Sequence, residues 1–231
     1  MSATGPRLEF WYDFASTYSY LSAMRIEALA AAAGVEVAWK PFLLGPIFTA
    51  QGWTTSPFNL YPAKGRNMVR DIERLAAERD LDFALPQRFP QNSLMAARLA
   101  LVGGDEGWIA AFTRAVYVAE FAHAADISDR QALGSILQSL HLDSQKIFTR
   151  IEQGDIKDRL SAAIVLFEQN DLRVGVIVLE VANIAHIGAA KGVHALIIVA
   201  NDEDVALLGR ELLQQRILHL VGILILVGQE V

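Results

Sequence analysis

The segment that decides the fold is Phe10-Trp11-Tyr12-Asp13-Phe14-Ala15-Ser16-Thr17-Tyr18-Ser19-Tyr20-Leu21. Residues 7–12 include the first three residues of this segment, and their alternation in polarity predicts a β-strand. Residues 17–33 are mostly strong helix formers and stop before Gly34, so they predict one α-helix that begins after Ser16. This order places the hydroxyl of Ser16 at the start of a helix, beside backbone N–H groups and the positive end of the helix dipole.

A second strand and a long loop follow this helix. Residues 35–40 predict a strand that ends at Pro41. A strand, a helix and a strand in this order form a β-α-β unit with parallel strands and a right-handed crossover. Residues 41–64 contain repeated prolines and glycines and predict a loop. Because long loops inside compact domains are more often functional than idle, this loop is a candidate part of a binding site.

The rest of the chain separates into a helical part and a second set of strands. From residue 65 to about residue 170, apolar side chains recur at helical spacing. Short β-branched runs predict strands at residues 174–179 and 194–199, and residues 203–218 return to helical spacing. The expected fold class is therefore α/β, in the order β-α-β, helices, β-β-α. We expect one α/β domain built from residues 1–64 and 165–231, with an all-helical insertion of residues 65–164.

The composition excludes several classes of function. Of the 231 residues 53% are apolar and the formal net charge is −6, which indicates a sizeable core and no general attraction for nucleic acid or anionic membranes. The chain contains no cysteine, so disulfides, thiolate metal sites and a cysteine nucleophile are excluded. The five histidines show no metal-ligand spacing, and no metal is expected.

Two segments bear on the location of the protein. Residues 1–6 lack the basic and apolar regions of a secretory signal. The longest uncharged apolar run, residues 220–227, is shorter than the roughly 20 residues that span a bilayer, and it is interpreted as a buried strand or helix end. We therefore expect a cytoplasmic protein that does not enter a membrane.

Four segments in a fixed order resemble one known family. They are residues 13–21 (DFASTYSYL), 52–59 (GWTTSPFN), 61–66 (YPAKGR) and 89–94 (FPQNSL). The chain resembles DsbA-type proteins, which have a thioredoxin-like fold with a helical insertion. Within them it is similar to the serine-containing branch, the 2-hydroxychromene-2-carboxylate isomerases and kappa-class glutathione transferases. The resemblance covers residues 8 to about 163 and implies a thioredoxin-like fold that uses glutathione.

The resemblance also implies roles for individual residues. In this family the serine contacts the glutathione sulfur, and the matching residue here is Ser16. A hydroxyl and backbone N–H groups at a helix start stabilise a thiolate and lower its pKa. The alternative is that Ser16 only caps the helix. Lys64 matches a family lysine near the bound tripeptide, and Asn59 is a second candidate contact; the alternative for both is an ordinary solvated side chain.

An aromatic substrate is the second implication of the resemblance. The substrate would be a hydroxychromene carboxylate or its ring-opened pyruvate. Its expected contacts are Phe14, Tyr18 and Trp53, with Tyr12 and Phe58 completing an aromatic wall, and ordinary packing is the alternative for Trp53. Relatives often form homodimers, so a homodimer through the helical insertion is also implied.

The last third of the chain departs from the family. All seven prolines lie at or before Pro90, so the proline loop that precedes the third strand and pairs with the cysteinyl part of the bound thiol is missing. A later Trp-Gly-x-Asp-Arg segment is missing too, and Thr17 replaces the proline that usually follows the serine.

Three functions stay open. The first is a glutathione-dependent isomerase, in which a thiolate adds to a conjugated double bond, allows rotation and leaves. The second is a kappa-like transferase, in which the thiolate stays attached. The third is a thioredoxin-fold binding protein without turnover.

Overall fold

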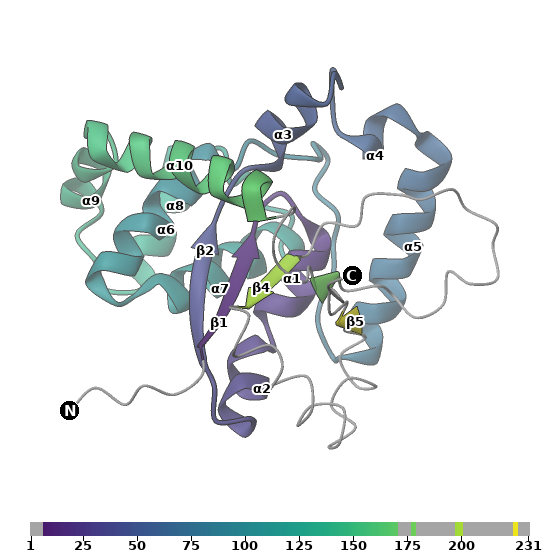
Figure 1. Cartoon of the computed structure of the whole chain (residues 1–231), viewed down its shortest axis with the longest axis horizontal. Helices are drawn as coiled ribbons and strands as arrows, with labels where there is room; N and C mark the ends of the chain where they lie inside the picture. Colours follow the sequence, from purple (N-terminus) through teal and green to yellow (C-terminus); the bar gives the residue numbers. More distant parts are fainter. Residues whose placement is uncertain (1–6, 171–176, 179–196, 201–223, 226–231) are drawn as a thin grey trace, which may run out of the picture.

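The computed structural model describes residues 7–170 and three short segments, 177–178, 197–200 and 224–225 (Figure 1). The strands are β1 (Arg7–Tyr12), β2 (Glu36–Pro41), β3 (Ile177–Val178), β4 (Ile197–Ala200) and β5 (Leu224–Ile225). The helices are α1 (Thr17–Ala23), α2 (Ile26–Ala32), α3 (Leu44–Ala50), α4 (Pro57–Leu60), α5 (Pro62–Glu78), α6 (Leu94–Glu106), α7 (Ile109–Phe121), α8 (Arg130–Ser139), α9 (Ser144–Arg150) and α10 (Gly154–Asn170).

The strands form one sheet in the order β2-β1-β4-β3-β5. β1 and β2 pair in parallel, which confirms the predicted β-α-β unit, and β4 lies antiparallel on the other side of β1. β3 pairs antiparallel with β4 and with β5. β1 is therefore an interior strand, and a residue that follows it emerges near the middle of the sheet.

Alternation along β1 separates two cores. Phe10 and Tyr12 belong to the main hydrophobic cluster, which contains residues of α1, α5, α6 and α7. Trp11 points to the other face, where it packs with Phe42 and with Phe167 of α10. Because successive side chains of a strand point to opposite faces, a single aromatic run supplies both cores.

The predicted loop at residues 41–64 is wrong in part, since it contains α3 and α4. Ser56 caps α4, where its Oγ accepts a hydrogen bond from the N–H of Phe58, and Pro57 is the first helical residue. Pro62 likewise opens α5, three residues before the predicted helical part. Proline is favourable in the first turn of a helix, so these prolines begin helices instead of marking a loop.

The predicted helix at residues 17–33 is also divided. α1 ends at Ala23 and α2 begins at Ile26, because the N–H of Arg25 bonds to the carbonyl of Ser22 in a tighter turn. β3 lies within the predicted strand at 174–179, β4 overlaps the predicted strand at 194–199, and β5 lies within the run 220–227. The predicted helix at 203–218 lies outside the described residues. The division into two domains stays a prediction.

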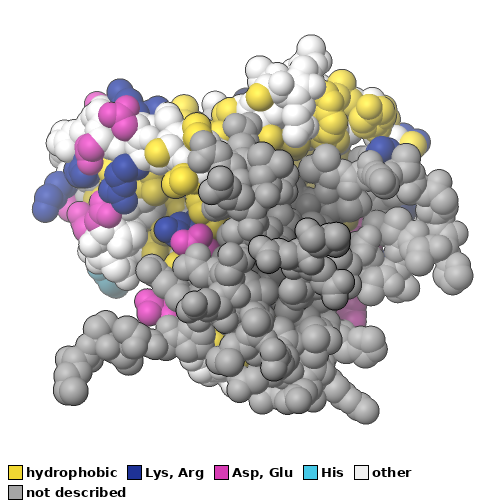
Figure 2. Space-filling view, viewed as in Figure 1, with side chains coloured by type: hydrophobic (Ala, Val, Ile, Leu, Met, Phe, Trp, Pro, Cys, Tyr) yellow, Lys and Arg dark blue, Asp and Glu magenta, His cyan; other side chains and the backbone are white. Residues whose placement is uncertain are grey.

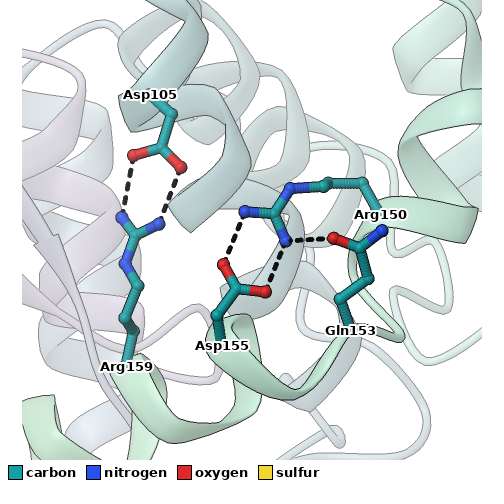
Figure 3. Close-up of polar contacts among 5 residues, drawn as sticks. All are labelled: Asp105, Arg150, Gln153, Asp155 and Arg159. Atoms are coloured by element: carbon teal, nitrogen blue, oxygen red, sulfur yellow. Dashed lines mark hydrogen bonds and ion pairs between the residues drawn. The ribbon is translucent and has the colours of Figure 1, made fainter.

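Ion pairs join α10 to α6 and to α9 (Figure 3). Arg159 of α10 binds Asp105 of α6 through two hydrogen bonds of 2.6 and 2.9 Å. Arg150 binds Asp155 in the same two-pronged way and also contacts Gln153. The hydrogen bonds from Arg159 lower the pKa of the Asp105 carboxyl. In the space-filling view, charged side chains gather over this part of the surface (Figure 2).

Replacement of Asp105 by asparagine is expected to have a small, pH-dependent effect. A carboxyl group whose pKa is lowered by folding stabilises the protein at pH values above its ordinary pKa, which is 3.8 for Asp105. This stabilisation is lost as the pH falls through the lowered pKa of the folded protein. Because the pair is partly exposed, the loss at neutral pH is about 0.5 kcal/mol of unfolding free energy. Urea unfolding at neutral pH in low salt should show this loss. A loss that persists in concentrated salt would contradict the electrostatic explanation.

Candidate functional site

Ser16 lies in the turn between β1 and α1, at the N-cap of the helix. Its Oγ accepts a hydrogen bond of 3.3 Å from the N–H of Ser19, and its own N–H donates to the carbonyl of Asp13 at 3.0 Å. The predicted place of the serine is therefore confirmed, and so is its capping contact. The side chain is buried, with 7% of its surface exposed, so a ligand atom would meet it over a small area.

Asp13 is a residue of this turn whose role was not predicted from the sequence. Its side chain is 3% exposed, and its carboxylate accepts hydrogen bonds from the N–H of Ala15 (3.0 Å), the N–H of Leu44 (2.7 Å) and the hydroxyl of Ser93 (2.6 Å). Burial raises the pKa of Asp13, and the three hydrogen bonds oppose that rise. A polar residue between a buried strand and a helix was a usable signal for Asp13, but nothing in the sequence pointed to Leu44 or Ser93.

Tyr18 connects the same turn to α5. It is half-buried, and its hydroxyl donates to Oδ2 of Asp71 at 3.0 Å. Arg74 binds the other oxygen of Asp71 at 2.5 Å. Burial and the neighbouring Asp71 carboxylate raise the pKa of Tyr18, so its hydroxyl keeps its proton at neutral pH.

The segment from α3 to α5 carries three more of the predicted residues. Trp53 is half-buried and its ring stacks on Phe48 of α3, with 5.3 Å between the ring centres. Asn59 is exposed, and its Nδ2 donates to Thr55 at 3.1 Å. Lys64 is exposed, and its Nζ lies 4.7 Å from the centre of the Tyr61 ring. In the space-filling view, hydrophobic side chains gather over the α4–α5 corner, where Leu60 and Tyr61 are among the exposed large apolar residues (Figure 2).

Gly65 makes the α4–α5 corner sterically tight. A Cβ atom at this glycine would lie 2.8 Å from the carbonyl oxygen of Phe58, which belongs to the backbone and cannot rotate away. The change of Gly65 to alanine is therefore expected to lower the unfolding free energy by about 1–3 kcal/mol through overpacking. Thermal unfolding of the variant measures this loss. Gly104→Ala, whose Cβ would have no neighbour nearer than 3.7 Å, is the matched control, and an equal loss there would refute the steric explanation.

Phe14 and Tyr12 lie in the core and not at a surface. Both are 0% exposed. The ring of Phe14 packs against Tyr12 and Tyr117, each with 5.3 Å between ring centres, and the hydroxyl of Tyr12 bonds to Thr113 of α7 at 2.7 Å. These side chains therefore offer no surface to a substrate, because the packing of α7 against β1 encloses them. Of the predicted aromatic contacts, Tyr18, Trp53 and Phe58 keep a partly exposed side chain.

Glu120 is a second buried carboxyl group that sequence reasoning missed. It lies on α7 and is 0% exposed, and among the residues that the structure describes neither of its carboxylate oxygens has a hydrogen-bond partner. Burial raises its pKa well above the ordinary value, and the nearby Asp13 and Asp126 raise it further. Apolar spacing along α7 gave no sign of a buried acid, since a glutamate on a helix is ordinarily solvated.

The structure thus assembles the site around the start of α1. Asp13 and Ser16 lie in the turn before α1 and Tyr18 lies in the first turn of α1, and the contact between Tyr18 and Asp71 places the middle of α5 beside them. Lys64 lies seven residues before Asp71 in the same helix, about 10 Å along its axis. Within residues 7–170, no group of His, Asp and Glu side chains is arranged to hold a metal ion, and no helix has the length and apolarity to cross a bilayer.

Two of these side chains have a chemistry that suits a thiol or a carboxylate. A hydroxyl at a helix start suits a thiolate, and an exposed lysine suits a carboxylate. No residue of the chain can itself exchange a disulfide, since cysteine is absent.

Comparison with known proteins supports the fold and the family. The family model described as "DSBA-like thioredoxin domain" matches residues 7–174. A 2-hydroxychromene-2-carboxylate isomerase of Sphingobium xenophagum is 26% identical over 141 residues, 61% of this chain and 71% of that protein. Glutathione S-transferase kappa 1 of Caenorhabditis elegans is 24% identical over 143 residues, 58% of this chain and 62% of that protein.

The solved structures agree with this assignment of the fold. A structure of 2-hydroxychromene-2-carboxylate isomerase matches with a TM-score of 0.69 at 15% identity, over 92% of this chain and 97% of that one. The predicted α/β class and thioredoxin-like fold are thereby confirmed. The roles predicted for Ser16, Tyr18, Trp53, Asn59 and Lys64 stay predictions.

Proposed function

The chain belongs to the family of DSBA-like thioredoxin domains, and from this premise we propose that it is a glutathione-dependent cis–trans isomerase of an aromatic carboxylate. The proposed substrate class is a hydroxychromene carboxylate or its ring-opened benzylidenepyruvate form. The observation that carries the proposal is the hydroxyl of Ser16 at the start of α1 in a chain without cysteine. In such a protein the sulfur must come with the ligand.

The reaction divides into a part supplied by the ligand and a part supplied by the chain. Bound glutathione would supply a thiolate that adds to the conjugated double bond, so that the resulting single bond rotates before the thiolate leaves. Ser16 would hold the sulfur, with its side-chain oxygen fixed by the N–H of Ser19. Tyr18 would border the substrate as a protonated hydroxyl, since its ordinary pKa already lies above neutral pH and burial raises that pKa further.

The α3–α5 segment would bind the remaining parts of the two ligands. Lys64 would pair with a carboxylate of the tripeptide, and Asn59 of α4, five residues earlier in the chain, has its side-chain amide at the surface. Trp53 is partly exposed, and it would present the face of its ring that does not stack on Phe48 to an aromatic substrate. These residues fit a ligand that is charged at its ends and aromatic beside its sulfur.

A transferase is the second candidate function, because one of the relatives is a kappa-class glutathione transferase. The two reactions share the same thiolate and differ only in whether it leaves. A binding protein without turnover is the third candidate. Its support is the missing proline loop before the third strand, since all seven prolines lie at or before Pro90.

Calorimetry and two assays separate the three functions. We expect heat on titration with glutathione and also with S-methylglutathione, which lacks the thiol. Isomerisation of 2-hydroxychromene-2-carboxylate should proceed with glutathione only. Conjugation of 1-chloro-2,4-dinitrobenzene without isomerisation would indicate the transferase, and the absence of both heat and turnover at millimolar glutathione would indicate the binding protein.

The cellular setting follows from the same proposal. A glutathione-dependent enzyme needs a compartment that supplies the reduced thiol, so the protein would act in the cytoplasm. It would form a homodimer. Sedimentation of the full chain across a range of concentrations tests the dimer.

A further inference from the structure

Asp13 makes hydrogen bonds to residues of several elements that meet at the candidate site. Its carboxylate binds Ala15 in the β1–α1 turn, Leu44 at the start of α3 and Ser93 at the start of α6. Its carbonyl oxygen accepts from the N–H of Ser16 at 3.0 Å and from the hydroxyl of Tyr117 in α7 at 2.9 Å. One residue thus connects the turn that holds Ser16 with three helices that are distant in sequence.

These bonds leave little freedom for the turn. Asp13 is 3% exposed, and each of its two carboxylate oxygens is occupied by a donor. Two of the donors are backbone N–H groups, which cannot turn into acceptors. An asparagine at this position would direct its NH₂ group at one of these N–H donors, so one contact must be lost while the side-chain volume is kept.

We propose that Asp13 is the positioning residue of the Ser16 site: it holds the serine hydroxyl in register with the starts of α3 and α6. The inference rests on the proposed function only for its catalytic consequence. Asp13 touches neither sulfur nor substrate in this scheme and acts through the backbone of Ala15 and Ser16. Through Leu44 it also fixes the start of α3, the helix that carries Phe48; the ring of Trp53, which follows α3 in the chain, stacks on Phe48.

A double-mutant cycle on stability tests the positioning role without any ligand. The variants are Asp13→Asn, Ser16→Ala and the pair, unfolded with urea in the full chain. If Asp13 holds the Ser16 turn, the asparagine variant has already lost part of the Ser16 cap, so the double variant loses less stability than the sum of the single losses. Additive losses would overturn the proposal. If Asp13→Asn does not fold, Ser93→Ala takes its place in the cycle. This variant leaves the Asp13 side chain unchanged and removes one of its hydrogen-bond donors, the Ser93 hydroxyl.

Thr113→Val is the matched control for this cycle. It removes another buried hydrogen bond of the same region, the 2.7 Å contact with Tyr12, and leaves the bonds of Asp13 in place. Its loss of stability should add to that of Ser16→Ala. An equal departure from additivity with this control would show that any loosening of the core disturbs Ser16, and Asp13 would have no special role.

Turnover supplies the second readout. Asp13→Asn is expected to lower kcat at least tenfold at saturating glutathione, with no further loss in the Ser16→Ala background, whereas Thr113→Val leaves kcat within twofold. Equal losses in both backgrounds would overturn the positioning role in catalysis. If the wild-type chain shows neither binding nor turnover while the stability cycle is non-additive, the proposed function fails and the positioning role stands.

Discussion

Replacement of Ser16 by alanine is expected to lower isomerase turnover about a hundredfold or more while the fold is kept. The physical reason is the loss of the Ser16 hydroxyl at the N-cap of α1, and removal of a comparable preorganised donor in other enzymes costs about 10²–10³ in kcat. Binding of S-methylglutathione should change much less, since its carboxylates are bound elsewhere. Steady-state kinetics at saturating glutathione measure the effect.

The same substitution also removes a helix cap, so it needs a control for stability. Loss of the bond from the N–H of Ser19 is expected to lower the unfolding free energy by about 1 kcal/mol. Asp143→Ala removes the corresponding cap of α9, where the carboxylate accepts from the N–H of Lys146 at the same spacing. That variant should lose similar stability and keep full turnover. Unchanged turnover in Ser16→Ala would show that the Ser16 hydroxyl has no catalytic role and would contradict the proposed function.

Replacement of Glu120 by leucine is expected to stabilise the protein by about 1–3 kcal/mol at neutral pH. Glu120 is fully buried, and both of its oxygens are unpaired within the described part of the chain; an unpaired buried polar group costs this much. Leucine has a similar volume and no group to desolvate. Chemical denaturation at a series of pH values measures the gain.

The gain at Glu120 should grow as the pH rises. Burial raises the pKa of this carboxyl above the ordinary value of 4.5, so below that pH both the folded and the unfolded chain hold the proton. As the pH rises further, the unfolded chain releases its proton before the folded chain does, and wild-type stability falls. Leucine removes this fall, and glutamine removes it while keeping the shape. A wild-type stability that rises over this range relative to Glu120→Gln would contradict a raised pKa.

The sequence was sufficient for the elements whose signal is local. Alternation in residues 7–12 predicted β1, and the small polar residue after it predicted the cap at Ser16. Prediction from the sequence failed where one local signal is compatible with two structures. Pro57 and Pro62 were interpreted as loop residues but begin helices, since a proline that ends one element is equally suited to open the next.

Burial was harder to predict than secondary structure. Phe14 was expected to contact a substrate because it stands beside Ser16 in the chain, yet α7 packs over it and leaves it 0% exposed. Glu120 was not singled out from the sequence, because a glutamate on a helix is ordinarily solvated, yet it is fully buried. Neither outcome depends on neighbours within a few residues, so no local pattern carries the information.

By itself the sequence determined that any thiol used at this site must come from a ligand, because the chain has no cysteine and places a serine at the start of its first helix. Only the tertiary structure decided what surrounds that serine. The hydrogen bonds of Asp13 to Leu44, Ser93 and Tyr117 join positions 31, 80 and 104 residues apart. Such contacts exist only after β1 has been buried between its helices, since a buried carboxyl takes whichever donors the packed helices bring to it.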